Sequence, residues 1–264
     1  MVREHPLPLT ISFTHGRWSA SWGITVLTVL AVLAFIDLGR WQWHRAQQKR
    51  ALAIAFAADN SGGAGAGRSA PVALGPRATA ALPRYALVSV HGHYDGEHQF
   101  LLDNISDAGQ PGYEVLTPLR LEDGRSLIVN RGWLPLTASR RQLPDVTLPS
   151  AALDSLASLT VAGKLDALPV AGIALGHVPP ASEGNWPRLT SFPTMNDLAS
   201  ALGHPLEAQQ LLLNADEPFG YTRDWRPSGF GPERHVGYAL QWWGFAGVAL
   251  GLYAYLNWRR TPAT

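Results

Sequence analysis

The 264-residue sequence predicts an α+β membrane protein: two transmembrane helices, N- and C-terminal, flank a mainly antiparallel β domain. The β domain is expected to be a sheet or small barrel with one or two short helices. Two apolar runs, one near each end of the chain, predict the helices. Between them, short alternating stretches separated by turn signals predict strands. These strands predominate in hairpins, with little strand-helix-strand alternation, which favours the antiparallel arrangement.

The first apolar run starts at Trp22 and carries no charge until Asp37. About 20 residues at about 1.5 Å rise cross a hydrocarbon core of about 30 Å, so a helix over residues 22–41 is long enough to span. A cleaved signal peptide is the alternative, and the small residues at 55–59 resemble a cleavage site. Polar and basic residues separate that site from the apolar run, which favours an uncleaved anchor. Residues 1–21 are then expected to form a cytoplasmic N-terminal tail.

The chain after this run changes character twice. Residues 42–58 contain good helix formers and no Gly or Pro, and they predict a helical extension. Residues 59–83 are rich in Gly, Ala, Ser and Pro, so they bury little surface and predict a flexible linker. Strand patterns begin at Arg84, and the β-rich domain is expected over residues 84–234.

The first strand pattern of this domain contains a histidine cluster. Asp95 and Gly96 predict a two-residue hairpin turn, with residues 98–104 as the return strand. In such a hairpin His93 would face His98 across the ladder, with His91 diagonal on the same face. Three imidazoles could hold zinc or copper, or they could occupy the wet side of a half-buried hairpin.

Further elements follow in order along the domain. The strands at residues 112–121 and 125–134 are joined by a Gly-containing turn, which is a second hairpin signal. A strand is expected at about residues 159–165. A short helix over residues 194–203 begins near a Thr cap and ends at Gly, and residues 208–214 predict a closing strand.

The second apolar run has no charge from residue 238 to 257. We assign residues 235–257 to a second transmembrane helix with a histidine-bearing lip, and residues 258–264 to a cytoplasmic tail. The alternative is a buried helix of a soluble core, which an uninterrupted run of this length at the C-terminus disfavours.

Three glycines on this helix, Gly244, Gly247 and Gly251, include a G-x-x-x-G pair. Small residues at this spacing let another helix approach closely. The sequence predicts an interaction face here, with either the first span or a helix of another protein as its mate.

The composition excludes several classes of function. The chain has no cysteine, so it has neither disulfides nor a thiolate site for copper or an iron–sulfur cluster. A net charge of +1 gives no basis for nucleic-acid binding. Basic residues flank both sides of the spans, so the positive-inside rule does not choose the topology. No nucleophile elbow, phosphate-binding glycine loop or paired catalytic carboxylate stands out, and we expect no enzyme.

Arg131, within the strand pattern at residues 125–134, is either a buried structural cation or an interface residue.

Eight uncommon sequence motifs occur in order between and within the two spans. They are LGRWQWHR at Leu38, RYALVSVHGHYD at Arg84, LLDN at Leu101, GQPGYEVLTPL at Gly109, VNRGWLP at Val129, NWPR at Asn185, RDWRP at Arg223 and GPERHVGYALQWWGFA at Gly231. Together they resemble the Surfeit locus protein 1 family, the bacterial and mitochondrial assembly factors of cytochrome c oxidase. The resemblance covers about residues 20–258.

The resemblance implies a multi-pass protein of the bacterial inner membrane with its central domain in the periplasm. It implies a non-enzymatic role in delivering haem a to the catalytic subunit of a haem-copper oxidase, with haem a as transient cargo and haem a synthase as a possible further partner. It also implies that a histidine at the start of the second span ligates the haem iron. His235 matches that position.

Helical spacing makes this assignment physically reasonable. His235, Tyr238 and Trp242 are three and four residues apart, so they share one helix face. Arg234 and Arg223 are cations that could hold haem propionates. The residues alone leave His235 equally suited to anchoring at the membrane interface. Two other functions stay open: a haem-independent scaffold that stabilises an immature oxidase subunit, and a membrane-tethered metal enzyme built on the hairpin histidines.

Overall fold

A computed structural model describes residues 9–13, 16–58, 70–137, 142–153, 158–170, 179–180, 183–227 and 231–260. The chain divides into two compact units. The helical unit contains residues Met1–Ile54 and Gly229–Thr264, and the β unit contains Ala55–Ser228.

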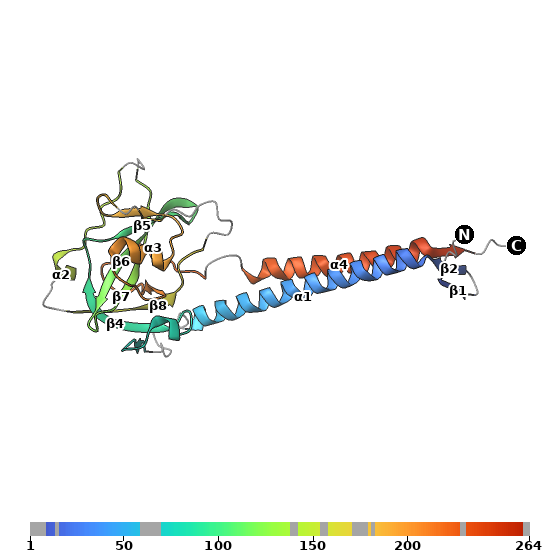
Figure 1. Cartoon of the computed structure of the whole chain (residues 1–264), viewed down its shortest axis with the longest axis horizontal. Helices are drawn as coiled ribbons and strands as arrows, with labels where there is room; N and C mark the ends of the chain where they lie inside the picture. The colour runs from blue at the N-terminus through green and yellow to red at the C-terminus, as the bar shows by residue number, and fades with distance from the viewer. Residues whose placement is uncertain are drawn as a thin grey trace, which may run out of the picture. The chain divides into compact units, whose positions relative to one another are not determined.

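The helical unit is built on two long helices, α1 (Trp22–Ala58) and α4 (Pro232–Asn257), which lie side by side (Figure 1). The Thr25 hydroxyl near the start of α1 is 2.6 Å from the Tyr253 hydroxyl near the end of α4. Phe35, further along α1, stacks on Trp242, which lies earlier in α4. Contacts in this reversed order make the pair antiparallel.

Helix α1 continues without a break through the predicted 42–58 extension. Among the described residues, it is the one helix that is apolar and long enough to cross a membrane, over Trp22–Ala57. Its aliphatic side chains are largely uncovered, and Leu27 is 67% exposed. Helix α4 does not meet the same test, because Gly, Tyr, Trp and Gln interrupt its aliphatic residues.

A small antiparallel sheet, in the strand order β1-β2-β11, lies at the end of the helical unit where α1 begins and α4 ends. It contains β1 (Leu9–Phe13), β2 (Gly16–Ala20) and β11 (Trp258–Arg260). Strand β2 ends just before α1 and β11 directly follows α4, so their pairing ties together the start of one helix and the end of the other. The expected plain tails at 1–21 and 258–264 therefore contain strands. Local patterns did not predict this sheet, because β11 pairs with β2, about 240 positions earlier in the chain, and β1 and β2 are short.

The β unit is centred on a closed barrel (Figure 1). Around it run β4 (Leu87–Tyr94), β8 (Leu159–Asp166), β10 (Gln210–Leu213), β7 (Ser126–Pro135) and β6 (Gln110–Leu121). Pairing of β4 with β6 closes the ring. Within the ring β10 and β7 run parallel and the other pairs are antiparallel. The expectation of an antiparallel sheet or small barrel is met by a barrel.

Two strands extend the sheet beyond β6, and a third lies beside β4. They are β5 (Phe100–Asp107), β9 (Arg188–Thr190) and β3 (Val72–Ala73). The short helices are η1 (Thr79–Ala81), α2 (Ser150–Leu153) and α3 (Met195–Leu202).

Helix α3 confirms the predicted short helix. Thr194 caps it by accepting a hydrogen bond from the Asp197 amide, while the Asp197 carboxylate accepts one in return from the Thr194 amide. Gly203 ends the helix with φ 76°, a left-handed conformation that glycine adopts at low cost.

The predicted hairpin at Asp95–Gly96 is wrong. Strand β4 pairs with β3, β6 and β8, whereas β5 pairs with β6 and β9. The Asp95 carboxylate accepts hydrogen bonds from the backbone amides of Glu97 and His98, which forms a wider turn than a two-residue hairpin loop. The chain therefore leaves β4 toward a different neighbour. The second predicted hairpin, β6–β7, is confirmed, with Gly124 at φ 84° in its turn.

Candidate functional site

In the helical unit, His235 lies against Gln42 of α1. Its Nδ1 is 2.8 Å from the Gln42 Oε1, and both side chains are partly buried. An amide oxygen only accepts hydrogen bonds, so in this pair Nδ1 carries the proton and donates. In the described part of the chain, no hydrogen bond or ion pair engages Nε2. In the neutral form of the ring, Nε2 therefore keeps its lone pair.

Aromatic rings pack between the helices next to this pair. The Trp242 ring stacks on Phe35, with centroids 5.8 Å apart and planes at 25°. The Trp243 ring is 6.0 Å from the Trp43 ring. It also lies over Gly39, where an added Cβ would be 2.2 Å from the Trp243 Nε1. The absence of a side chain at position 39 is thus what lets Trp243 reach α1.

Of the three residues predicted to share a face of α4, two contact α1 and the third is exposed. His235 and Trp242 contact α1 through Gln42 and Phe35, whereas Tyr238 is 45% exposed. The sequence did not point to Gln42 or Gly39 as partners of this face. Both belong to the motif at Leu38, but spacing within one helix carries no information about the facing helix.

The glycine face of α4 does not pack against α1. A Cβ built on Gly244, Gly247 or Gly251 would meet no atom within 4 Å. Ala239 and Ala246 are the residues of α4 that are buried. The idea that the glycines receive the first span is therefore wrong, because the large Trp242 and Trp243 rings occupy the interface and select Gly39 on the opposite helix. The glycine face is exposed.

The hairpin histidines do not form a metal site. His91 pairs with the Thr160 hydroxyl at 2.9 Å, and the Nδ1 of His98 is 2.9 Å from both carboxylate oxygens of Asp95. Within the described ranges, no group of three or more His, Cys, Asp or Glu residues could hold a metal ion. The predicted convergence fails because β4 and β5 are not paired with each other.

The comparison with known protein families matches residues 29–247 to the SURF1 family. The chain belongs to the SURF1 family. The match starts within α1, includes the whole β unit and ends within α4, so it contains both Gln42 and His235. This family of membrane-associated assembly factors is linked to cytochrome oxidase assembly and is not known for enzymes. A search of curated proteins gave no significant match.

The two arginines considered for haem propionates differ in this SURF1-family protein. Arg234 lies exposed in the first turn of α4, next to His235. Arg223 belongs to the β unit, where its guanidinium donates to the backbone carbonyls of Tyr221, Asn214 and Glu217. Arg223 is therefore a structural residue of the β unit, whereas Arg234 is a cation of the helical unit that directly precedes His235 in the chain.

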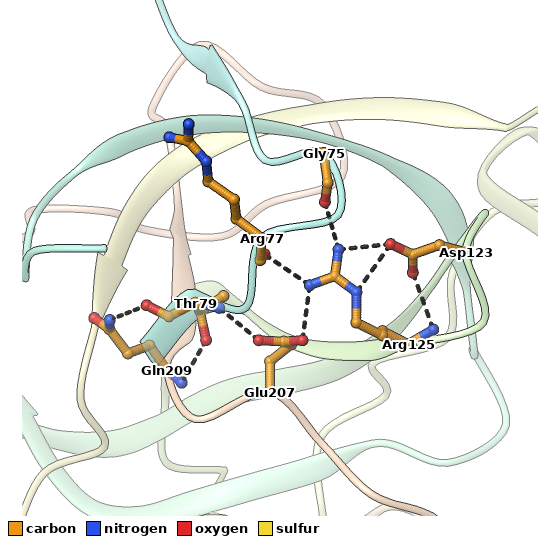
Figure 2. Close-up of polar contacts among 7 residues, drawn as sticks. All are labelled: Gly75, Arg77, Thr79, Asp123, Arg125, Glu207 and Gln209. Atoms are coloured by element: carbon orange, nitrogen blue, oxygen red, sulfur yellow. Dashed lines mark hydrogen bonds and ion pairs between the residues drawn. The ribbon is translucent and has the colours of Figure 1, made fainter. Parts of the chain in front are cut away.

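A polar network in the β unit centres on Arg125, just before β7 (Figure 2). The guanidinium donates to two carboxylates and two backbone carbonyls: Asp123 and Glu207, and Gly75 and Arg77. The Glu207 carboxylate also accepts from the Thr79 amide at 2.6 Å. Burial alone would raise the pKa of Glu207, but hydrogen bonds from Thr79 and Arg125 lower it overall.

This network borders a cleft of about 390 Å³. Every nitrogen of the Arg125 guanidinium is used within the chain, so the network ties three separate segments together and offers no unused donor from this arginine to a ligand. Sequence reasoning missed it, because its members are up to 132 residues apart, from Gly75 to Glu207.

Arg131 is a structural cation. It is 2% exposed and donates to the carbonyl of Phe219 and the side-chain oxygen of Gln99, at 2.7 and 3.0 Å. Its guanidinium also lies over the Tyr221 ring. Burial lowers the pKa of Arg131. The structure thus decides between the two roles that the sequence left open.

Proposed function

We propose that this protein binds haem a transiently through the Nε2 of His235 and passes it to the catalytic subunit of a haem-copper oxidase. The observation that carries the proposal is the contact between His235 and Gln42. A neutral imidazole with its Nδ1–H engaged and its Nε2 lone pair unused has the electronic form of an axial haem ligand. Bound haem a would be cargo, and one protein ligand suits a carrier that must release it.

The residues around His235 suit such cargo. Tyr238 and Trp242 offer aromatic surface on the same side of α4, and Arg234 is a cation beside the ligand that suits a propionate. His235 and Trp242 are separated by about 10 Å along the helix, comparable with the width of a porphyrin. The exposed apolar residues of both helices suit a lipid environment for the hydrophobic tail of haem a.

We place both helices in the bilayer. Helix α4 packs along α1 from the Gln42–His235 pair to the Thr25–Tyr253 pair, so a membrane that holds α1 also holds α4. Gln42 follows Thr25 by 17 positions, a rise of about 26 Å, which is close to a hydrocarbon thickness of about 30 Å. His235 would then lie near one boundary and the β1-β2-β11 sheet near the other. In this proposal the sheet is cytoplasmic and the β unit is periplasmic, in the bacterial inner membrane.

The proposal is tested with detergent-purified protein from cells that also express a haem a synthase. Wild type should show the absorption bands of haem a, and His235→Ala should lose them. His44→Ala is the matched control, since His44 is an exposed histidine on α1. Haem retained by His235→Ala, or lost equally in both variants, would refute His235 as the ligand.

A haem-independent scaffold is the second candidate function, and the exposed glycine face of α4 favours it. A partner helix could approach closely at Gly244 and Gly251, where the structure leaves open space. Copurification of the oxidase catalytic subunit with wild type and with Gly244→Leu tests this function. The scaffold would be favoured over haem delivery if haem-free wild type still captures the catalytic subunit and the Gly244→Leu variant does not.

A further inference from the structure

We infer that Gln42 is a positioning residue that fixes the tautomer and ring orientation of His235. The two side chains come from different helices, and their 2.8 Å contact is a polar link between α1 and α4. A histidine free in water exchanges its proton between the two ring nitrogens. Here the Gln42 oxygen selects the Nδ1–H form, which leaves Nε2 as the ligating atom.

The surroundings hold Gln42 at this place. One turn earlier on α1, Gly39 lies beneath the Trp243 ring, and the next residue, Trp43, contacts the same ring. About two turns after His235 along α4, Trp242, the neighbour of Trp243 in the chain, is stacked on Phe35. The Gln42–His235 bond therefore lies beside tightly packed rings, and it needs no movement of either helix to form.

The chemistry of an amide acceptor also fits transient binding. Histidines that ligate metals commonly donate their second N–H to a carboxylate or carbonyl, and a carboxylate makes the ring a stronger donor to the metal. Gln42 offers a neutral oxygen, so it orients the ring without adding charge beside it. The geometry points to a ligand that is preorganised but of moderate strength, as cargo release requires. This last step rests on the proposed function, whereas the tautomer does not.

The first test needs no haem. The tautomer is measured by ¹⁵N NMR of the full chain in detergent with labelled histidine, and His235→Ala identifies the signal. Wild type should show Nδ1–H, and Gln42→Met should lose this preference because the thioether is a poor acceptor. Gln42→Glu, which keeps an acceptor, should restore it. An Nε2–H form in wild type, or an unchanged form in Gln42→Met, would overturn the inference.

The second test measures haem a affinity in the same variants. Loss of a partner that orients a metal ligand typically weakens binding about 10- to 100-fold. The affinity of Gln42→Met for haem a should therefore be about 10- to 100-fold lower than that of wild type. Gln42→Glu should bind at least as tightly as wild type and shift the haem reduction potential downward. Gln47→Met, at an exposed glutamine on the same helix, is the control.

The outcomes separate this inference from the proposed function. If wild type binds no haem a, the delivery function fails while the NMR result still decides the tautomer. If wild type binds through His235 and Gln42→Met binds equally well, only the role of Gln42 fails. Far-UV circular dichroism of each variant confirms that its helices are intact, and rescue by Gln42→Glu excludes a general packing defect.

Discussion

The substitution Gly39→Ala tests whether the packing of Trp243 on α1 sets the geometry of the His235 site. An added Cβ at position 39 would lie 2.2, 2.5 and 2.9 Å from three atoms of the Trp243 ring. Carbon atoms in contact normally lie about 3.5–4.0 Å apart, so the ring must retreat by about 1.3 Å. The Gln42–His235 bond, at 2.8 Å, reaches the usual limit of about 3.2 Å after a much smaller movement.

The energetic effect can be estimated from two opposing terms. Overpacking a close contact costs about 1–3 kcal/mol. Replacing a helical glycine with alanine returns about 0.5–1 kcal/mol of conformational entropy. Since the clash involves three ring atoms, the first term should dominate, and we expect a net loss of about 1–2 kcal/mol. Gly244→Ala is the matched control: its Cβ meets no atom within 4 Å, so it should gain about 0.5–1 kcal/mol.

Reversible unfolding in mixed detergent and SDS gives the free energies of unfolding for both variants. A second readout uses the absence of native cysteine. Spin labels attached to cysteines introduced at Thr25 and Tyr253, whose hydroxyls are 2.6 Å apart, should report a longer and broader distance between α1 and α4 when Gly39→Ala is added. If Gly39→Ala is as stable as Gly244→Ala and keeps the Nδ1–H form of His235, then Trp243 packing does not position the site.

Three further predictions concern the β unit. Arg125→Ala should lower the free energy of unfolding of the β unit by about 2–3 kcal/mol in urea titrations, because the substitution leaves the buried Glu207 carboxylate without its cation. The control Arg120→Ala, at an exposed arginine, should change this free energy by less than about 0.5 kcal/mol. Equal effects of the two substitutions would refute the role of the network. The pKa of Glu207 is lowered below its ordinary value of 4.5, so the contribution of this carboxylate to stability is fully present above pH 4.5 and is lost as the pH falls through the folded-state pKa. Glu207→Gln should therefore flatten the dependence of the free energy of unfolding on pH between about pH 6 and pH 3. An unchanged slope would contradict this. Gly132→Ala should destabilise the β unit by about 1–3 kcal/mol, since φ is 114° at this position and the new Cβ would lie 2.6 Å from the Thr222 carbonyl oxygen. The control is Gly75→Ala, where φ is also positive but no atom lies within 4 Å of the new Cβ. Equal thermal unfolding temperatures for the two variants would show that the close contact is unimportant.

Local sequence patterns predicted what depends on near neighbours in the chain. The cap at Thr194 and the stop at Gly203 predicted α3, because both act within a few residues. The β6–β7 hairpin was predictable from its turn for the same reason. At Asp95 the same reasoning failed, since the carboxylate accepts from the amides of Glu97 and His98 and widens the turn.

The sequence by itself determined the family, the long apolar helix α1, the position of His235 at the start of α4 and the strand-rich character of the β unit. These properties reside in residue types and short spacings. Only the tertiary structure decided that β4 and β6 close a barrel, that Gln42 faces His235 and that Gly39 admits Trp243. Those pairings join residues up to about 200 positions apart, and they are selected by the fit of side chains between elements, which no pattern within a single helix or strand contains.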